Sequence, residues 1–360
     1  MNAIGTNSVI SFDRVTKTYE GTAKPAVDGV TFSVRHGEFF SILGPSGSGK
    51  TTILRLIAGF ERPDNGLISM GRDVVNDVPP FKRDVRTVFQ SYALFPHLTI
   101  QENVEYPLKM RGEPKPMRQK KIAETLALVE MSEFVDRMPH SLSGGQRQRA
   151  ALARSIVSRP RVLLLDEPLA ALDLRLRQQM QHTLASLQKE LGIAFIYVTH
   201  DQGEALSMSD RVMVLNEGRI SQLSGPQEIY FAPQTEFVSR FVGRSNLIPV
   251  TFVPFKNGFC GQIEGQVFSG LTSTSSHTAR MAIRYDAVLI QPVTSGFRKD
   301  DAIAGTIEDV LFMGTTCEVN VRCGSLHLIG TIPAIREVQY TVGQSVSIEF
   351  DFSNAQVFHE

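Results

Sequence analysis

The sequence lacks an excess of charge of either sign and any long apolar run. Its 360 residues include 37 basic and 37 acidic side chains, which argues against a strongly cationic nucleic-acid-binding protein. No stretch approaches the roughly 18 consecutive apolar residues that indicate a membrane-spanning helix. The first residues show no basic region followed by an apolar segment, so we expect no secretory signal.

Cysteine is also scarce, with three residues and no C-x-x-C spacing. We expect Cys260, Cys317 and Cys323 to be reduced packing residues rather than a disulfide or metal set. Cys317 and Cys323 share the parity of one strand, but this pattern alone does not favour a metal or redox role.

Strand-like and helix-like segments alternate up to about residue 240. Residues 161–165 and 193–198 are short apolar runs typical of strands buried on both faces. Between them, apolar residues recur at helical spacing and the helix ends at Gly192; the stripe is Leu176, Met180, Leu184, Leu187 and Leu191. This order predicts a parallel α/β domain over residues 1–240.

Two regions depart from this alternation. Residues 91–157 are predicted to be a mostly helical insertion into the α/β domain. Residues 241–360 contain short β-type runs separated by Gly and Ser/Thr turns, which predicts a small all-β barrel, OB-like in type, with no catalytic constellation. The expected runs are 262–268, 281–284, 302–311, 317–323, 326–332 and 345–350.

A glycine-rich segment follows the apolar run 39–43 and precedes a helical stripe that ends at Gly59. It fits G-x-x-x-x-G-K-[ST], and its residues are Gly44, Pro45, Ser46, Gly47, Ser48, Gly49, Lys50, Thr51 and Thr52. Such a loop turns backbone N–H groups toward phosphate oxygens at a helix N-terminus. Lys50 is expected to reach the β- and γ-phosphates, and Thr51 to hold Mg²⁺. The segment predicts nucleoside triphosphate binding; the alternative is a structural Gly-rich turn.

An acidic pair follows the strand 161–165 at the edge where parallel α/β sheets bind ligands. Asp166 is expected to hold Mg²⁺ directly or through water. Glu167 is the candidate for orienting and deprotonating the water that attacks the phosphate. The alternative is a pair of acids that cap the next helix.

A third segment, Leu142–Gln146, follows Pro139 and opens a predicted helix. Two glycines and a serine at a helix start can present N–H donors and a hydroxyl to an anion. The candidate ligands are Ser143, Gly144, Gly145 and Gln146. A plain helix N-cap gives the same pattern, so both interpretations remain open.

These segments occur in the order that is seen in ATP-binding cassette (ABC) ATPases, and the sequence from about 10 to 240 resembles that family. Within the resemblance, Tyr19 is similar to the aromatic residue that stacks on adenine, and Gln90 to the glutamine that contacts Mg²⁺. Asp173 falls in the segment that contacts the second subunit. His200, in the pair Thr199-His200, matches the histidine that bonds the γ-phosphate.

The resemblance implies an ATPase with ATP and Mg²⁺ as cofactors, working as a homodimer. Two chains would hold two ATP molecules, with Ser143 and its neighbours acting across the interface. The C-terminal region resembles the TOBE-type barrel of bacterial uptake ATPases, most closely of the spermidine/putrescine type. Gly203 stands where this group usually has Glu, and Tyr285-Asp286 where it usually has Pro-Glu.

The implied partners are two integral-membrane permease subunits and, indirectly, a solute-binding protein, with no nucleic acid. The implied location is the cytoplasmic face of the bacterial inner membrane. Importers of ferric iron, sulfate, phosphonate or sugar remain alternatives. A soluble ABC ATPase acting on nucleic acid or ribosomes fits less well, because the chain has one cassette and no long heptad run. An exporter ATPase also fits less well, because such ATPases are usually fused to or paired with membrane spans and lack this C-terminal barrel.

The segment Tyr92–His97 follows Gln90 closely and is rich in aromatic and apolar residues. Its character suits a groove for a short helix of a permease subunit. Internal packing of the helical insertion is the alternative.

Overall fold

The computed structural model describes residues 8–255, 258–275, 277–293, 301–334 and 340–359. The chain folds into two compact units, Met1–Pro226 and Gln227–Glu360, each with its own hydrophobic core. The sequence places the boundary near residue 240, at the end of a short helix, and that assignment stays a prediction. Over the described ranges, no helix is both long and apolar enough to cross a bilayer.

The first unit is built on a six-stranded sheet with the order β10-β9-β3-β8-β7-β6. Strands β6, β7, β8, β3 and β9 are parallel, and β10 pairs with β9 antiparallel. The bounds are β3 (Phe39–Leu43), β6 (Val85–Val88), β7 (Val162–Asp166), β8 (Ala194–Thr199), β9 (Arg211–Asn216) and β10 (Arg219–Ser224). The expected parallel α/β architecture is thus confirmed, and β3 coincides with the predicted run 39–43.

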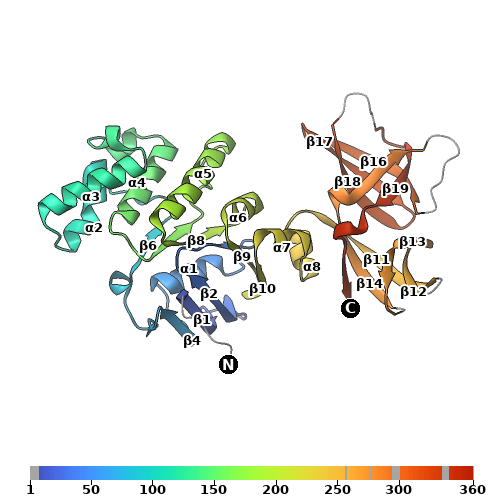
Figure 1. The fold of residues 1–360 in the computed structure, drawn as a ribbon, viewed down its shortest axis with the longest axis horizontal. Coiled ribbons are helices and arrows are strands. Elements are labelled where there is room, and N and C mark those ends of the chain that lie inside the picture. Colours follow the sequence, from blue (N-terminus) through green and yellow to red (C-terminus); the bar gives the residue numbers. More distant parts are fainter. Residues whose placement is uncertain (1–7, 256–257, 276, 294–300, 335–339, 360) are drawn as a thin grey trace. The chain divides into compact units, whose positions relative to one another are not determined.

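A second sheet, with the order β2-β1-β4-β5, is antiparallel throughout. Its strands are β1 (Ser8–Lys17), β2 (Val27–Arg35), β4 (Asn65–Met70) and β5 (Asp73–Val74). Helix α1 (Lys50–Ala58) shares one core cluster with both sheets, through Ile53 and Leu56 packed with Phe12 and Ile42. Figure 1 shows α1 between the two sheets. One face of the central sheet is therefore covered by α1, and the helices described next cover the other, which explains why its strands are continuously apolar.

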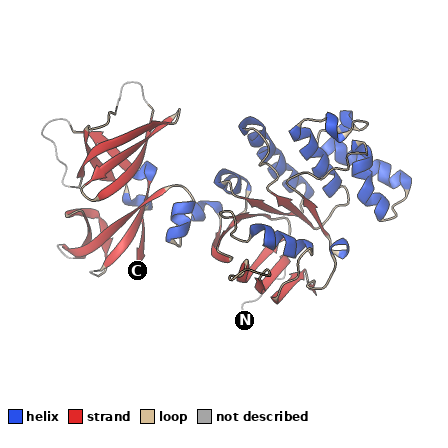
Figure 2. Ribbon diagram, turned by 180° about the vertical axis from the view of Figure 1, so that it is seen from behind, coloured by secondary structure: helices blue, strands red, loops and turns tan. Residues whose placement is uncertain are grey.

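Helices α2 (Ile100–Met110), α3 (Lys115–Leu128) and α4 (Gly144–Ile156) occupy the region predicted to be a helical insertion. They share a core cluster with α5 (Leu174–Leu191) and with the other face of the sheet, where Phe39 and Phe195 lie. Helix α5 matches the predicted apolar stripe and ends at Gly192, whose left-handed φ of 62° closes it. Figure 2 shows these helices as a layer on one side of the sheet.

Short helices connect these elements to the rest of the chain. Helix α6 (Gln202–Met208) follows β8, and α7 (Pro226–Phe231) and α8 (Glu236–Phe241) follow β10. The 3₁₀ turns are Pro80–Lys82, Ser132–Phe134, Pro139–Ser141, Tyr285–Ala287 and Phe352–Asn354.

The second unit contains two antiparallel five-stranded sheets, with orders β13-β12-β11-β14-β20 and β15-β19-β16-β17-β18. Their inner faces share one core cluster, which agrees with the expected small β-barrel domain. The bounds are β11 (Ser245–Phe255), β12 (Gly258–Ile263), β13 (Gln266–Ser273), β14 (Thr278–Arg284), β15 (Val288–Pro292), β16 (Ile303–Phe312), β17 (Thr316–Cys323), β18 (Leu326–Pro333), β19 (Ser345–Phe350) and β20 (Gln356–His359).

One expected strand, 262–268, is wrong as a single element. The chain reverses at Glu264-Gly265, where both residues have positive φ (48° and 80°) and Ile263 pairs with Gln266. This is a two-residue hairpin turn, and it divides the run between β12 and β13. The apolar residues on either side hid the turn, because glutamate is an unusual residue for a left-handed position.

The three cysteines are free thiols in this unit. Burial, together with the nearby charge of Glu264, raises the pKa of Cys323 to about 11, so this thiol is unreactive near neutral pH.

Candidate functional site

The loop before α1 contains two glycines where a side chain would clash with neighbouring backbone. Gly49, the N-cap of α1, has φ 103°, and a Cβ there would lie 2.2 Å from the carbonyl oxygen of Ala26. A Cβ at Gly44 would lie 2.4 Å from the carbonyl oxygen of Leu215. The loop is thus held tightly against neighbouring backbone and curls over the N-terminus of α1, which is the geometry of an anion cradle.

Lys50 folds back across this cradle. Its Nζ donates hydrogen bonds of 2.9 Å to the carbonyl oxygens of Gly44 and Pro45. Burial lowers the pKa of Lys50, while the negative charges of Glu167 and Asp166 act to raise it. Nearby, the Oγ of Ser48 is buried and has no hydrogen-bond partner within the described part of the chain. A cation held by weak neutral acceptors and an unpaired buried hydroxyl both favour an incoming anion.

The carboxyl ends of β3, β6, β7 and β8 bring the predicted acidic and polar residues to one edge of the sheet. The register pairs Asp166 with Val198 and Leu43 with Thr199. It also pairs Val88 with Leu165, so Gln90 follows the neighbouring strand end and is exposed. Burial, and secondarily the charge of Glu167, raises the pKa of Asp166. The charges of Arg55 and Lys50 offset this only in part, so a further cation at this edge would favour the ionised carboxylate.

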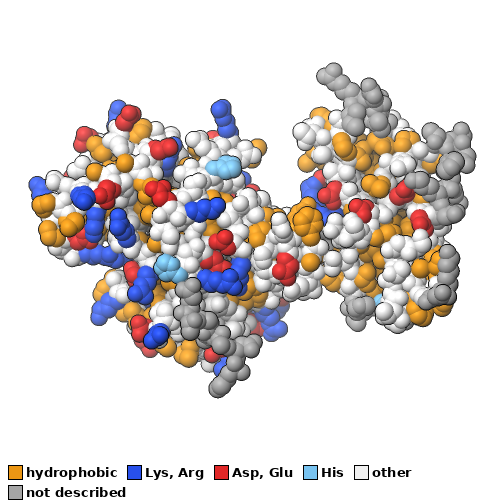
Figure 3. Space-filling view, in the orientation of Figure 1, with side chains coloured by type: hydrophobic (Ala, Val, Ile, Leu, Met, Phe, Trp, Pro, Cys, Tyr) orange, Lys and Arg blue, Asp and Glu red, His pale blue; other side chains and the backbone are white. Residues whose placement is uncertain are grey.

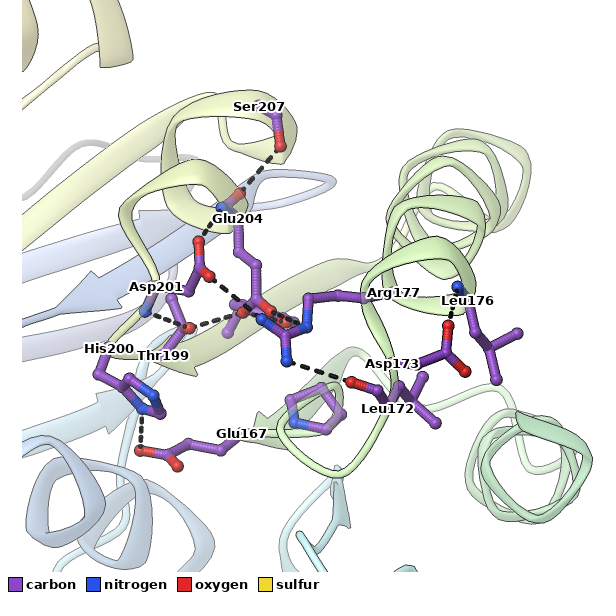
Figure 4. Close-up of polar contacts among 12 residues, drawn as sticks. Glu167, Leu172, Asp173, Leu176, Arg177, Thr199, His200, Asp201, Glu204 and Ser207 are labelled. Atoms are coloured by element: carbon purple, nitrogen blue, oxygen red, sulfur yellow. Dashed lines mark hydrogen bonds and ion pairs between the residues drawn. The ribbon is translucent and has the colours of Figure 1, made fainter. Parts of the chain in front are cut away.

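Glu167 lies one step beyond β7 in a left-handed conformation, with φ 43°. Its amide N donates to the carbonyl oxygen of Val198 at 3.0 Å, which holds this turn on the end of β8. Its Oε1 lies 3.2 Å from Nδ1 of His200, and Figure 4 shows the two side chains pointing toward each other. A left-handed glutamate costs roughly 1–3 kcal/mol, and such strain concentrates at functional sites.

Tyr19 and the hydroxyls of α1 complete this side of the site. The Tyr19 Oη donates to Thr52 Oγ1 at 3.4 Å, and the Nζ of Lys17 lies 5.8 Å from the centre of the ring. Thr51 is exposed in the first turn of α1. The half-buried ring therefore borders the cradle and offers a stacking surface.

The residues predicted to hold a metal supply oxygen donors of three kinds. Thr51 offers a hydroxyl, Gln90 an amide oxygen and Asp166 a carboxylate. This set fits Mg²⁺, which takes few protein ligands beside phosphate and water oxygens. Across the described ranges no group of three or more His, Cys, Asp or Glu residues could hold a metal, which is compatible with a site whose only acid is Asp166.

Ser143 and Gln146 form a capping box at the start of α4. The Gln146 N donates to Ser143 Oγ at 3.3 Å, and the Ser143 N donates to Gln146 Oε1 at 2.9 Å. A Cβ at buried Gly145 would lie 3.0 Å from the side chain of Leu176, so this segment is packed closely on α5. Asp173 caps α5 through a 2.9 Å bond from the Leu176 N.

Ser143 and Asp173 are therefore neighbours on one exposed surface of the first unit. Among the residues that the structure describes, no hydrogen bond or ion pair joins either of them to the loop 44–52. The predicted site residues thus fall into two groups within one chain. The cradle group contains Lys50, Asp166, Glu167 and His200, and the second group lies around Ser143.

The sequence did not predict a polar network beside His200. The carboxylate of Glu204 is buried and accepts hydrogen bonds from Tyr197 Oη at 2.8 Å and Thr199 Oγ1 at 2.6 Å. Arg177 from α5 reaches the same place, as Figure 4 shows. Asp201 and Glu204 have the spacing of a helix N-cap and its third residue, so the only sequence signal for them is that of helix capping.

We expect Asp166→Asn to raise the thermal unfolding midpoint of the nucleotide-free protein at pH 7. A carboxyl whose pKa is raised in the folded state begins to destabilise the fold as the pH rises through its unfolded-state pKa, and the full cost is reached above its folded-state pKa. The difference in unfolding midpoint between the variant and the wild type should shrink as the pH falls below the ordinary pKa of an aspartate. Differential scanning fluorimetry from about pH 3 to pH 8, which spans the ordinary Asp pKa, measures this difference.

The control for this variant is Asp173→Asn, because asparagine is an equally good N-cap and Asp173 is exposed. We expect that control to leave the midpoint unchanged. A lower midpoint for Asp166→Asn at pH 7 would show that Asp166 stabilises the nucleotide-free fold.

Comparison with known proteins extends over both units. Residues 27–170 match the family described as ABC transporter. The "Spermidine/putrescine import ATP-binding protein PotA" of Oleidesulfovibrio alaskensis is 44% identical over 316 residues, or 86% of this chain and 84% of the relative. The "Uncharacterized ABC transporter ATP-binding protein YdcT" of Escherichia coli is 57% identical over 238 residues, or 66% of this chain and 70% of the relative.

Among solved structures, the chain is similar to a dimeric ATP-binding cassette in a post-hydrolysis state bound to ADP and Pi. The TM-score is 0.54 and the sequence identity 33%, and the match covers 60% of this chain and 98% of that one.

Proposed function

The chain belongs to the ABC transporter family of ATP-binding proteins, and from this premise we propose that it powers solute import, with a polyamine of the spermidine/putrescine type as the solute. ABC transporter ATPases bind ATP, and this chain is one of them. The observation that carries the mechanism is the arrangement of Lys50, Glu167 and His200 around one cradle.

In the proposed mechanism, each cradle residue has one task. The Lys50 Nζ exchanges its bonds to the Gly44 and Pro45 carbonyls for the β- and γ-phosphate oxygens, which are stronger acceptors. Glu167 orients the attacking water and takes its proton. His200, held at 3.2 Å by Glu167, bonds the γ-phosphate. Tyr19 stacks on the adenine.

Mg²⁺ fits the same proposal. Thr51, Gln90 and Asp166 would hold it, and the ion would neutralise charge on the phosphates. The raised pKa of Asp166 supports this role, because a bound cation would relieve the cost of the ionised carboxylate.

The second group of site residues supports action across a homodimer. Ser143, Gly144, Gln146 and Asp173 lie on a surface that the cradle of the same chain does not use, and Gly145 is buried directly beneath it. The similar dimeric cassette supports the proposal that a second copy of this chain presents that surface to the cradle. Each ATP would then lie between two chains, and closure would depend on the γ-phosphate.

The importer assignment rests on the part of the sequence match that extends beyond the cassette. The Escherichia coli relative is the more identical of the two, but its match covers only two thirds of this chain and its name gives no solute. A match of that length therefore does not identify the solute. The polyamine-import relative covers most of both chains, β-rich unit included. We place the cassette at 1–240 and a TOBE-like regulatory domain at 241–360, on the cytoplasmic face of the inner membrane beside two permease subunits and, indirectly, a solute-binding protein.

The test is solute uptake in a bacterial strain that lacks this gene and carries it back on a plasmid. We expect radiolabelled spermidine or putrescine uptake to return with the wild-type chain and not with Lys50→Ala. Ferric iron, sulfate, phosphonate and maltose are the comparison solutes. Restored uptake of one of these instead would keep the ATPase and overturn the polyamine assignment.

The segment Tyr92–His97 is the proposed contact with a permease subunit. Tyr92 is buried and its Oη donates to the carbonyl oxygen of Pro168 at 3.4 Å, next to Glu167. The Phe95 ring is half-buried and packs on Tyr106, with ring centres 4.7 Å apart. This segment therefore contacts the catalytic turn on one side and carries aromatic surface on the other.

We expect Phe95→Ala to weaken capture of the permease subunits and transport, while ATP binding by the isolated subunit stays near normal. Pull-down of the permease pair and nucleotide titration measure the two effects. Phe81→Ala is the control, because Phe81 is 79% exposed and lies outside this segment. Unchanged permease capture, or an equal loss of nucleotide binding, would leave internal packing as the role of Phe95.

A further inference from the structure

A partly buried ionic network lies behind His200 and ties it to α5. Its centre is the guanidinium of Arg177, in the first turn of that helix. Nη1 donates to Asp201 Oδ2 at 3.4 Å, and Nη2 donates to the carbonyl oxygen of Leu172 at 3.1 Å. Nε faces Glu204 Oε1 at 3.9 Å. Figure 4 shows Arg177 reaching from α5 toward the start of α6.

The acidic residues of this network, Asp201 and Glu204, hold the two residues that flank His200 in the sequence, Thr199 and Asp201. Thr199 Oγ1 donates to Glu204 Oε2 at 2.6 Å and accepts from the Asp201 N at 2.9 Å. The Asp201 Oδ1 accepts from the Glu204 N at 3.0 Å. The backbone on either side of His200 is therefore fixed by groups that Arg177 contacts.

The other side of the network is the turn that leads into α5. Leu172 precedes Asp173, the N-cap of α5, and the Arg177 N donates to the carbonyl oxygen of Asp173 at 2.9 Å. This last contact is the ordinary helix bond of the first turn, so the Arg177 side chain itself holds the peptide that joins Leu172 and Asp173. A shift of that turn must move the guanidinium or break its bonds.

We propose that Arg177 is a positioning residue that links the Leu172–Asp173 turn to His200. The proposal rests on the proposed function, in which Asp173 faces a second chain and His200 bonds the γ-phosphate. Contact with the second chain fixes the conformation of the turn, and the turn fixes the position of the Arg177 guanidinium. The guanidinium in turn holds the Thr199–Asp201 backbone that carries His200. Hydrolysis would then require the partner chain for a reason beyond the residues it contributes to the site.

The network is compact enough to transmit such a shift. Glu167, Arg177, Thr199, His200, Asp201 and Glu204 all line one cavity of about 40 Å³. Glu204 is nearly inaccessible to solvent, so its charge depends on Arg177 and on the two hydroxyl donors. Removing the guanidinium leaves a buried carboxylate without its cation, so we expect the Glu204 side chain to move.

The chain offers a matched control in the pair Arg211–Glu38. Both arginines are similarly buried, at 27% and 21% side-chain exposure, and both carboxylates are 4% exposed. Arg211 also donates to a backbone carbonyl oxygen, that of Ser33. A purely structural role predicts the same behaviour for Arg177→Ala and Arg211→Ala.

The first measurement is independent of catalysis. The full-length protein is labelled at histidine ring carbons, and the signal of His200 among the eight histidines is identified by its loss in His200→Ala. We expect the His200 signal to shift or broaden in Arg177→Ala and to stay in place in Arg211→Ala. Arg177→Lys keeps the positive charge but loses the planar guanidinium with its several N–H donors, and it should shift the His200 signal by an intermediate amount. It replaces the alanine variant if that variant does not fold.

The second measurement is ATP hydrolysis. We expect Arg177→Ala to lower kcat by about 10–100-fold, the range for residues that orient a catalytic group, with single-chain ATP affinity unchanged. Arg211→Ala should keep kcat. An unmoved His200 signal, or a moved signal with wild-type kcat, overturns the proposal. A wild-type chain that binds ATP without hydrolysing it overturns the proposed function instead, whatever the His200 signal does.

Discussion

Glu167→Gln should bind ATP with wild-type affinity and hydrolyse it about 10²–10⁴ times more slowly, the usual effect of losing a general base. Glutamine has the shape of glutamate and keeps an acceptor oxygen near His200. It cannot take a proton from water at neutral pH. The binding surface is retained because Lys50 and the loop 44–52 are untouched.

The same variant should accumulate as a dimer in the presence of ATP. Closure requires the γ-phosphate, and a site that binds without hydrolysing keeps it. Size-exclusion chromatography with multi-angle light scattering measures the dimer, and phosphate release measures the rate. Dimer that appears with ATP and disappears with ADP is the expected pair of results.

Glu130→Gln is the control for the backbone at this position. Glu130 also has a left-handed φ, of 57°, and its carboxylate pairs with Arg149 on the surface. We expect this control to hydrolyse ATP at the wild-type rate. Wild-type turnover in Glu167→Gln, with affinity unchanged, would remove Glu167 from the role of general base.

Features that depend only on residues close together in the sequence could be predicted. The phosphate loop, the strand 39–43 before it and the helix stop at Gly59 form one continuous segment, so local geometry alone specifies them. Helix α5 was predictable for the same reason, because its apolar stripe and its terminal Gly192 are both local signals.

Features that depend on strand register or on unusual backbone could not be predicted. Arg177, Tyr197 and Glu204 meet because α5, β8 and α6 pack together, and no spacing in the sequence indicates it. The left-handed backbone conformation of Glu167 could not be predicted from the sequence for a related reason. Glutamate has no preference for that conformation, and the contacts with β8 impose it.

The last prediction concerns the surface around Ser143, whose role a single chain cannot reveal. We expect Ser143→Arg to bind ATP as a single chain and to fail in dimer closure and hydrolysis, because the bulky cation occupies the proposed interface. The variant also loses the N-cap of α4, at a cost of about 1 kcal/mol. Thr99→Arg removes the equivalent capping box from α2 and controls for that loss.

Mixing Ser143→Arg with Lys50→Ala decides whether the two groups act across chains. Each variant alone should be inactive. In a mixed dimer, one site combines the intact Lys50 of one chain with the intact Ser143 of the other, and the second site carries both substitutions. If pairing were random, half of the dimers would be mixed with one intact site each, so recovered hydrolysis should reach at most about a quarter of the wild-type rate. If mixed dimers form and no hydrolysis returns, the sites do not act as independent units shared between two chains. Recovery from two inactive parents would mean that Ser143 serves the cradle of the partner chain, because no single chain in the mixture carries both residues intact.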